Sequence, residues 1–196
     1  MHTITEVLPY DGQARYFGPV LSPEASAHFQ ETLLGQIVWE SDQVFIYGKH
    51  YITKRQVAWY GDKSYPYTYS KSTKRALPWT PALLSLKQQI EDLTGEVYHT
   101  CLLNLYPSGE EGMGWHSDDE KELRKNGSIA SLSLGALRPF DFKHRASGHK
   151  VRILLEPGSL LEMRGTTQTH WLHALPKTKK VKGLRINLTF RQMEQG

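Results

Sequence analysis

The side chains of this sequence that are best suited to chemistry lie in the segment Trp115-His116-Ser117-Asp118-Asp119-Glu120. Residues two apart on an extended segment point to the same side, so His116 and Asp118 can present an imidazole and a carboxylate to one metal ion. Histidines that could supply a third ligand lie in Thr169-His170-Trp171-Leu172-His173. Two histidines and one carboxylate on one face of the ion are typical of non-haem Fe(II) sites. A surface histidine beside a solvated acid is the alternative, which the spacing alone leaves open.

A second group of candidate side chains follows from strict alternation in the last predicted strand, 184–191. One face carries Arg185, Asn187, Thr189 and Arg191, and the other carries Leu184, Ile186, Leu188 and Phe190. Arginine forks bind carboxylates through two parallel hydrogen bonds, so two arginines on one face could hold a dicarboxylate. The alternative is an exposed sheet face with scattered charge.

The elements that must position these side chains begin with two helices. Ser22-Pro23-Glu24 supplies an N-cap, a proline at the first helical position and an acid in the first turn. We expect this helix to end at Gly35. Thr80-Pro81 repeats the opening signal, and Gly95 is placed to end the second helix.

The second half of the sequence is rich in short alternating or β-branched segments, which predict strands. They are 97–106, 129–137, 140–142, 151–155, 160–163 and 184–190. Helices followed by many short strands favour a mainly β fold with flanking helices (α+β), of the β-sandwich or jelly-roll type. The segment 48–80 is rich in lysine, tyrosine and turn formers, so we expect long loops or short edge strands there.

The composition limits the class of protein. The 196 residues match one domain, and 39% hydrophobic with 22% charged residues excludes a disordered polyelectrolyte. The single cysteine, Cys101, excludes an internal disulfide and multi-cysteine zinc or iron–sulfur sites. The first residues lack the pattern of a signal peptide, and no apolar run reaches membrane-spanning length. We therefore expect an intracellular protein, cytoplasmic or nuclear/nucleoid-associated, without a membrane partner.

The charge of the chain is unevenly distributed. The formal net charge is only +4, yet basic residues gather in the blocks 49–75, 138–152 and 176–196. Acidic segments separate these blocks, which indicates a polar molecule with a cationic face. Ordinary solvated charge is the alternative.

The motifs together resemble the AlkB family. They are H-x-D at His116 and Asp118, the distal His173, and R-x-N-x-T-F-R from Arg185 to Arg191. The resemblance runs from about Val20 to Arg191 and is strongest to the mammalian-type homologues two and three. It implies a double-stranded β-helix (jelly-roll) domain over 20–194, preceded by an N-terminal extension over 1–19 and including a nucleotide-recognition region over 44–75.

The resemblance also implies the reaction and its cofactors. The family consists of dioxygenases that use Fe(II), 2-oxoglutarate and O2, and repair alkylated nucleic acids. The implied activity is DNA repair by oxidative demethylation of N-alkylated bases such as 1-methyladenine and 3-methylcytosine, which releases succinate, CO2 and formaldehyde. The implied Fe(II) ligands, which are also the catalytic residues, are His116, Asp118 and His173, with His170 a non-ligand neighbour. The implied 2-oxoglutarate contacts are Asn104, Tyr106, Arg185, Asn187, Thr189 and Arg191.

Substrate contacts are implied in several segments. Tyr47, in Ile46-Tyr47-Gly48-Lys49, matches a wedge that fills the space of a flipped base, although a tyrosine that ends an edge strand is the alternative. The other implied contacts are Gly48, Lys49, Tyr60, Gly61, Asp62, Asp119, Glu120, Arg145, His149, Lys150, Lys177, Lys179 and Lys180. Tyr60 would stack on the base, Asp119 would face it, and the basic residues would hold phosphates.

The identity of the substrate has alternatives. The segment between Arg145 and Val151 is shorter than in the duplex-specific homologue, so alkylated DNA, single- or double-stranded, and RNA are all open. A protein hydroxylase of the same chemistry and a non-catalytic nucleic-acid-binding jelly roll are further alternatives. A zinc hydrolase is weaker, because it gives no role to the two arginines of the last strand. We expect a monomer.

Overall fold

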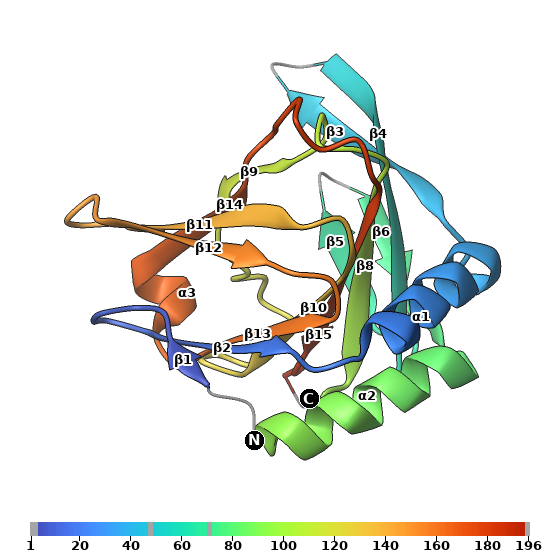
Figure 1. The fold of residues 1–196 in the computed structure, drawn as a ribbon, viewed down its shortest axis with the longest axis horizontal. Coiled ribbons are helices and arrows are strands. Elements are labelled where there is room, and N and C mark those ends of the chain that lie inside the picture. The colour runs from blue at the N-terminus through green and yellow to red at the C-terminus, as the bar shows by residue number, and fades with distance from the viewer. Residues whose placement is uncertain (1–3, 47–48, 70–71, 195–196) are drawn as a thin grey trace.

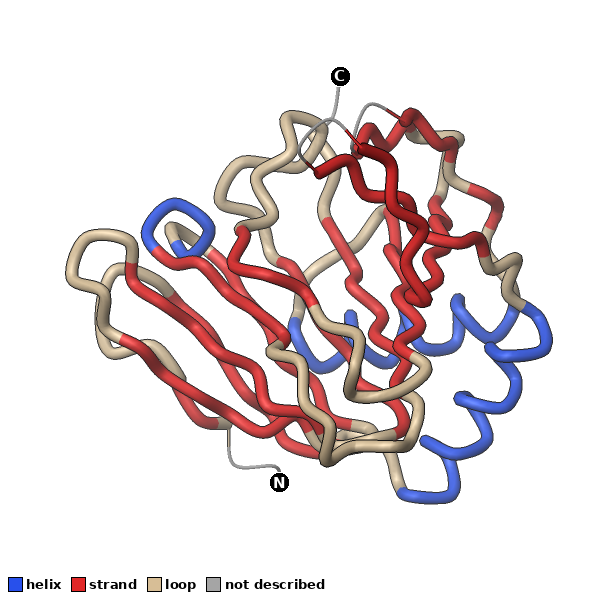
Figure 2. The backbone as a smooth tube through the Cα atoms, turned by 90° about the horizontal axis from the view of Figure 1, so that it is seen from above, coloured by secondary structure: helices blue, strands red, loops and turns tan. Residues whose placement is uncertain are grey.

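The computed structural model describes residues 4–46, 49–69 and 72–194, with the backbone alone described over 43–46, 49–51, 66–69 and 72–74. Two antiparallel sheets face each other, and helices α1 (Pro23–Gln36) and α2 (Pro81–Thr94) cover the outer face of the larger sheet (Figures 1 and 2). None of the helices in the described part of the chain has the length and apolar character that crossing a membrane requires.

The larger sheet holds nine of the described strands. In spatial order it runs β1 (Thr5–Glu6), β2 (Gln13–Pro19), β13 (Ser159–Arg164), β10 (Ile129–Gly135), β15 (Arg185–Arg191), β8 (Thr100–Tyr106), β4 (Lys49–Gly61) and β3 (Glu40–Ile46), with β7 (Leu77–Pro78) paired to β4. The smaller sheet runs β12 (Lys150–Leu155), β11 (Arg138–His144), β14 (Trp171–Leu175) and β9 (Met113–His116). A separate hairpin pairs β5 (Pro66–Tyr69) with β6 (Ser72–Arg75).

From β8 to β15 the chain passes repeatedly between the two sheets. β8, β10, β13 and β15 belong to the larger sheet, while β9, β11, β12 and β14 belong to the smaller one. This winding of antiparallel strands between two stacked sheets is a jelly roll, and it confirms the predicted mainly β fold class.

The helices begin where the sequence predicts. The Ser22 Oγ accepts a hydrogen bond from the Ala25 N–H at 3.1 Å, and the Thr80 Oγ1 accepts one from the Leu83 N–H at 3.3 Å. Helix α2 ends at Gly95, whose φ of 73° is left-handed and suits glycine. The predicted end of α1 at Gly35 is wrong, because the helix continues to Gln36 and Ile37 caps it in an extended conformation.

The main core lies between the helices and the larger sheet. Ile186, Leu188 and Phe190 of β15 pack there with leucines of both helices, including Leu33 and Leu83. The alternate residues of β15 therefore face the smaller sheet. Since this second face is enclosed between the sheets, the arginine row is buried, and the interpretation of it as an exposed sheet face is wrong.

Strand β4 corrects the prediction for 48–80. It is a strand of 13 residues, and it lies between β3 and β8 with hydrogen bonds to both. Composition did not predict this strand, because its lysines and tyrosines contribute to a segment that is rich in turn formers as a whole.

The N-terminal residues are part of the sheet as well. β2 pairs with β13 over Gln13–Pro19, and β1 pairs with β2. The predicted boundary between an extension over 1–19 and a domain from residue 20 therefore does not follow the architecture.

Candidate active site

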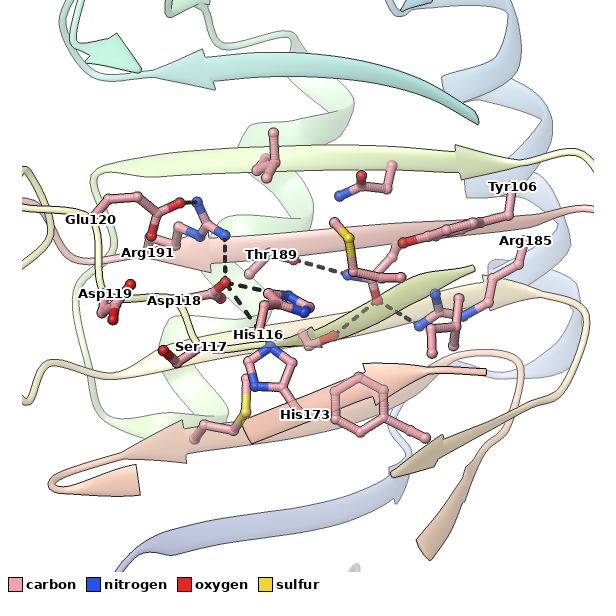
Figure 3. A pocket seen from close by; sticks show the side chains of 18 residues that line it. Tyr106, His116, Ser117, Asp118, Asp119, Glu120, His173, Arg185, Thr189 and Arg191 are labelled. Atoms are coloured by element: carbon pink, nitrogen blue, oxygen red, sulfur yellow. Dashed lines mark hydrogen bonds and ion pairs between the residues drawn. The ribbon is translucent and has the colours of Figure 1, made fainter. Parts of the chain in front are cut away.

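Strand β9, at the edge of the smaller sheet, and its neighbour β14 bring together the predicted metal ligands. His116 on β9 lies directly opposite His173 on β14 in the antiparallel register, and their ring centroids are 4.3 Å apart. Asp118 follows β9 by two residues, and its Oδ1 lies 3.8 Å from His116 Nε2 and 4.0 Å from His173 Nε2 (Figure 3). The ligand atoms of the three residues all lie within 4.8 Å of one another, so one ion can contact all three.

Neighbouring groups orient each of these side chains. His116 Nδ1 lies 2.8 Å from the Gly114 carbonyl oxygen, so Nδ1–H donates there and Nε2 is left for a metal. The His173 ring stacks on Phe140, with centroids 5.5 Å apart. The Asp118 N–H donates to Gln168 Oε1 at 2.9 Å, which anchors the backbone beside the carboxylate. The cluster is therefore held in place before any ion binds.

The charges in the cluster suit a divalent cation. Burial, in opposition to the attraction of Asp118, lowers the pKa of His173 to about 3, so its imidazole is neutral at neutral pH. Burial would raise the pKa of Asp118, but Arg191, His173 and His116 together lower it below the ordinary value. The neutral His173 imidazole and the ionised Asp118 carboxylate are the protonation states in which these side chains bind a metal ion. The donor set therefore fits Fe(II).

A polar row crosses the three central strands of the larger sheet next to this cluster. In the register, Arg185 lies opposite Tyr106, and Asn187 lies opposite Asn104 on one side and Ser133 on the other. The Asn187 Oδ1 accepts from Arg185 Nη2 at 2.6 Å and from the Ser131 hydroxyl at 2.9 Å, and Asn187 Nδ2 donates to Thr189 Oγ1 at 2.9 Å. Asn104 and Tyr106 thus form one continuous surface with the polar residues of the R-x-N-x-T-F-R motif, Arg185 to Arg191.

Arg185 is the feature of this row that most clearly indicates a ligand. It is 2% exposed, its Nη2 also donates to the Ser133 hydroxyl at 2.8 Å, and its guanidinium lies 5.6 Å from the Tyr106 ring centroid. Its Nε has no hydrogen-bond partner and, among the described residues, it forms no ion pair with a carboxylate. Burial lowers its pKa to about 10. Because a buried cation is costly without a partner, the site fits an anionic ligand such as a carboxylate.

Arg191 has a different role. Its Nη2 lies 3.1 Å from Asp118 Oδ1, and its Nη1 lies 3.4 Å from Glu120 Oε1 (Figure 3). The Arg191 guanidinium therefore bridges the carboxylate of Asp118, a candidate metal ligand, and that of Glu120. This arrangement holds the loop after β9 against β15.

Both clusters line one cavity of about 270 Å³. Its lining includes Asn104, Tyr106, Asp119, Glu120 and the polar row, with Met113, Phe140 and Leu175 as apolar walls. A second cavity of about 690 Å³ shares Asp118, Asp119 and Glu120 with the first and is also lined by Arg145. Arg145 is exposed and donates from Nη2 to the Ser117 hydroxyl at 2.8 Å. Predicted residues of five separate segments, 104–106, 116–120, 145, 173 and 185–191, therefore line the two cavities.

Other predicted substrate contacts lie on the surface or outside the description. Lys150, Lys177, Lys179 and Lys180 are exposed, and His149 is exposed with its Nδ1 3.2 Å from the Tyr10 hydroxyl. Tyr47 and Gly48 lie outside the described residues, as does the side chain of Lys49. Asp62 is exposed, and its Oδ1 accepts from Trp79 Nε1 at 2.6 Å.

The structure corrects the prediction for Tyr60. Its ring is 2% exposed in the core beneath the helices, and its hydroxyl accepts from the Val38 N–H at 3.2 Å. It lies opposite Cys101, whereas the residues that line the cavity are Leu102 and Asn104. Tyr60 is therefore on the wrong face of the sheet to stack on a base, and Trp59 is on the cavity side. Gly61 is packed against Thr100 and the His99 carbonyl, so it serves close packing of the strands.

Several structural partners of the site were not predicted. Gln168 and Phe140 orient two of the candidate ligands, and Arg55 forms a buried ion pair with Asp42 and lies 3.1 Å from Met113 Sδ. Phe140, Arg55 and Asp42 lie in strands that could not be paired in advance, and Gln168 lies in the one-turn helix 167–170, which no sequence signal marked.

Comparisons with known proteins agree with this geometry. The family model described as "2OG-Fe(II) oxygenase superfamily" matches residues 13–191. The DNA oxidative demethylases ALKBH2 of Bos taurus and Homo sapiens are each 41% identical over 159 residues, which is 77% of this chain and 57% and 61% of theirs. The alpha-ketoglutarate-dependent dioxygenase alkB homolog 3 of Bos taurus is 43% identical over 122 residues, which is 58% of this chain and 43% of that protein. The chain thus spans about three fifths or less of these curated relatives.

A solved structure of OsALKBH1 shares the fold. It aligns with a TM-score of 0.65 and 16% identity, over 97% of this chain and 100% of that chain. The family uses Fe(II) and 2-oxoglutarate with O2, which agrees with the His-Asp-His cluster and the buried arginine beside it. On the match over 13–191 and these relatives, the chain belongs to the 2OG-Fe(II) oxygenase superfamily, as a member of its AlkB family.

Proposed function

We propose that this chain is a DNA oxidative demethylase that removes N-alkyl groups from bases such as 1-methyladenine and 3-methylcytosine. The observation that carries the proposal is the His116, Asp118 and His173 cluster beside a buried arginine that lacks a carboxylate partner among the described residues. The names of the ALKBH2 relatives support DNA as the substrate class. A non-catalytic nucleic-acid-binding module is not favoured, because it gives no reason to bury these groups together.

Fe(II) would be held by His116, Asp118 and His173. With 2-oxoglutarate and O2 as co-substrates, the metal would supply the oxidising power to hydroxylate an N-methyl carbon, with 2-oxoglutarate converted to succinate and CO2 and the methyl carbon released as formaldehyde. The chain contributes the geometry. Arg191 fixes the Asp118 carboxylate, and Phe140, Met113 and Leu175 exclude water from the ligands.

2-Oxoglutarate would lie along the polar row. Arg185 would pair with one carboxylate, since its buried Nε has a donor that no hydrogen bond uses. The remaining contacts that we propose are Asn104, Tyr106, Asn187, Thr189 and Arg191, all of which line the same cavity.

The alkylated base would be recognised through its charge. Methylation at N1 of adenine or N3 of cytosine makes the base cationic, and Asp119 is an exposed carboxylate at the edge of the cavity, with Glu120 beside it. An opposite charge within a few ångströms favours a cation over the neutral, undamaged base. Arg145, Lys150, Lys179 and Lys180 would contact phosphates of the strand. The short β11–β12 turn leaves little chain for a second strand, so we propose that single-stranded DNA is the preferred form.

The test is formaldehyde release from oligonucleotides that carry 1-methyladenine, with Fe(II) and 2-oxoglutarate present. We expect turnover that requires both, its loss in His116→Ala, and its retention in His28→Ala, a matched change at an exposed histidine of α1. Undiminished turnover of His116→Ala would overturn the assignment. Competition among single-stranded DNA, duplex DNA and RNA carrying the same lesion would identify the preferred nucleic acid.

We also propose that the chain acts inside the cell, in the cytoplasm or with the chromosome, and as a monomer. Sedimentation of the loaded protein with and without oligonucleotide would test the oligomeric state.

A further inference from the structure

A second cluster of metal-ligating side chains lies at one end of the sandwich, away from the polar row. Asp11 belongs to the β1–β2 turn, His144 ends β11, and His170 ends the one-turn helix α3 (Thr167–His170). These three segments lie side by side on the left of Figure 1, although more than 100 residues of sequence separate the first from the others. One ligand atom of each residue lies within 4.8 Å of the other two, the same limit that the His116 cluster meets.

His144 is the member of the cluster that most needs a partner. The residue is 5% exposed, and its Nε2 is buried without a hydrogen bond in acceptable geometry. The nearest charged group to Nε2 is the Asp11 carboxylate, with Oδ2 at 3.3 Å. A buried ring nitrogen without a hydrogen bond is uncommon in folded proteins, and it indicates a ligand that the protein atoms do not supply.

Asp11 is held in an unfavourable backbone conformation that directs it to this place. Its φ of 51° is left-handed, a region that few residues other than glycine adopt. The neighbouring Tyr10 is fixed on both sides, since its carbonyl accepts from Trp171 Nε1 at 3.0 Å and its hydroxyl lies 2.9 Å from the Ser147 hydroxyl. Non-glycine residues held in such conformations gather at ligand sites.

The spacing of His144 and Asp11 fits a small transition-metal ion. Ligand atoms about 2.0–2.1 Å from zinc in a tetrahedral site lie roughly 3.3–3.4 Å apart, and the distance between His144 Nε2 and Asp11 Oδ2 is 3.3 Å. His144 Nδ1 lies 2.9 Å from the Ser147 hydroxyl, which can accept Nδ1–H when Nε2 binds a metal. The Ser147 N–H also donates to Nδ1 at 3.1 Å, so metal binding at Nε2 requires that this contact be lost and that Nδ1 carry the proton.

We propose that Asp11, His144 and His170 bind a divalent transition-metal ion, with Zn²⁺ the best match, and with a water molecule in the fourth position. Imidazole and carboxylate donors in a site with one open position suit zinc. The site is separate from the His116 cluster and does not rest on the proposed function.

The ion would add a further link between three chain segments that already contact one another, since Trp171 Nε1 donates to the Tyr10 carbonyl and β11 pairs with β14. The Arg145 N–H donates to the His170 carbonyl at 2.8 Å, and β14, which carries His173, starts directly after His170. A metal here would therefore stabilise the β11–β12 hairpin and the start of β14 together, close to residues that the candidate active site uses.

Zinc stoichiometry tests the proposal in a variant that lacks the first cluster. Metal-depleted His116→Ala/Asp118→Asn is dialysed against Zn²⁺, and bound metal is measured by elemental analysis. We expect one equivalent of zinc, and a loss to below 0.2 equivalents, on the order of the blank, when Asp11→Asn or His170→Asn is added. Asparagine tolerates the left-handed conformation at position 11, so Asp11→Asn removes the charge without straining the turn.

Matched controls separate this site from loose binding to surface residues. His149→Asn removes an adjacent histidine outside the trio, and Asp92→Asn removes an exposed carboxylate on α2. Both should retain the full equivalent. Circular dichroism verifies the fold of each variant, and His170→Asn replaces Asp11→Asn if the latter is not folded. Less than half an equivalent in the parent, or equal zinc in the parent and the folded trio variants, would overturn the proposal.

Discussion

Replacing Arg185 by methionine should have opposite effects on ligand binding and on stability. The guanidinium is buried in the polar row, contacts Ser133 and Asn187, and forms no ion pair with a carboxylate among the described residues. If 2-oxoglutarate supplies the missing anion, Arg185→Met removes its main partner. Without 2-oxoglutarate, the same change removes a buried charge that nothing nearby neutralises.

The sizes of both effects follow from the structure. Hydrogen bonds to a charged group contribute roughly 1.5–3 kcal/mol each, so losing one or two of them should raise the KM for 2-oxoglutarate about 10- to 10⁴-fold. Burial lowers the pKa of Arg185 from 12.5 to about 10, which corresponds to a cost on the order of 3 kcal/mol for keeping the group charged. Two lost neutral-partner hydrogen bonds offset about 2 kcal/mol of this. We expect a melting temperature of the 2-oxoglutarate-free chain that is unchanged or up to about 5 °C higher.

The assays are succinate formation against 2-oxoglutarate concentration and thermal unfolding without the co-substrate. Arg152→Met is the matched control, because Arg152 is exposed and paired with Asp141 on β11, and it should change neither quantity appreciably. A KM within threefold of the parent in Arg185→Met would refute the carboxylate role. A melting temperature more than about 5 °C lower would refute the argument from uncompensated charge.

Three further predictions follow from the site. Asp119→Asn should raise the Kd for an oligonucleotide with a methylated, cationic base about 10-fold and that for unmethylated DNA less, which fluorescence anisotropy with both oligonucleotides measures. Equal losses for both would contradict charge recognition. Because His173 has a folded pKa of about 3 against 6.5 unfolded, only the unfolded state binds a proton between these values, so the metal-free chain should lose stability as the pH falls from about 6.5 toward 3. Urea unfolding should show a smaller loss for His173→Gln, and parallel pH profiles would disprove the assignment. Tyr60→Phe should keep full turnover and lose about 1 kcal/mol of stability with its hydrogen bond from Val38, whereas a large loss of turnover would restore Tyr60 as a base contact.

The sequence was sufficient to predict the elements whose signals are local. Ser22 and Thr80 cap their helices as predicted, because capping depends on residues within one turn. The alternation in β15 separated the arginine row from the core face correctly, since side chains alternate in any strand. The fold class followed from the number and spacing of short strands.

What the sequence could not provide was register and pairing between distant segments. Tyr60 and Trp59 differ by one position, and only the pairing of β4 with β8 decides which of them faces the cavity. The packing of Gln168 against the Asp118 backbone joins residues 50 apart in sequence, and no periodicity reveals it. Gly35 did not end α1, because the chain stays helical through Gln36 and becomes extended only at Ile37.

The interior position of β4 has a consequence for engineering substrate preference. Recognition segments at the edge of a fold can be exchanged between relatives as modules, but β4 shares ladders with β3 and β8, and β8 also carries Asn104 and Tyr106. Replacing 44–75 with the segment of a relative would therefore disturb the position of β8 and of the active-site residues that it carries. The β5–β6 hairpin forms a two-stranded sheet of its own, so it is the part of this region that can be exchanged independently.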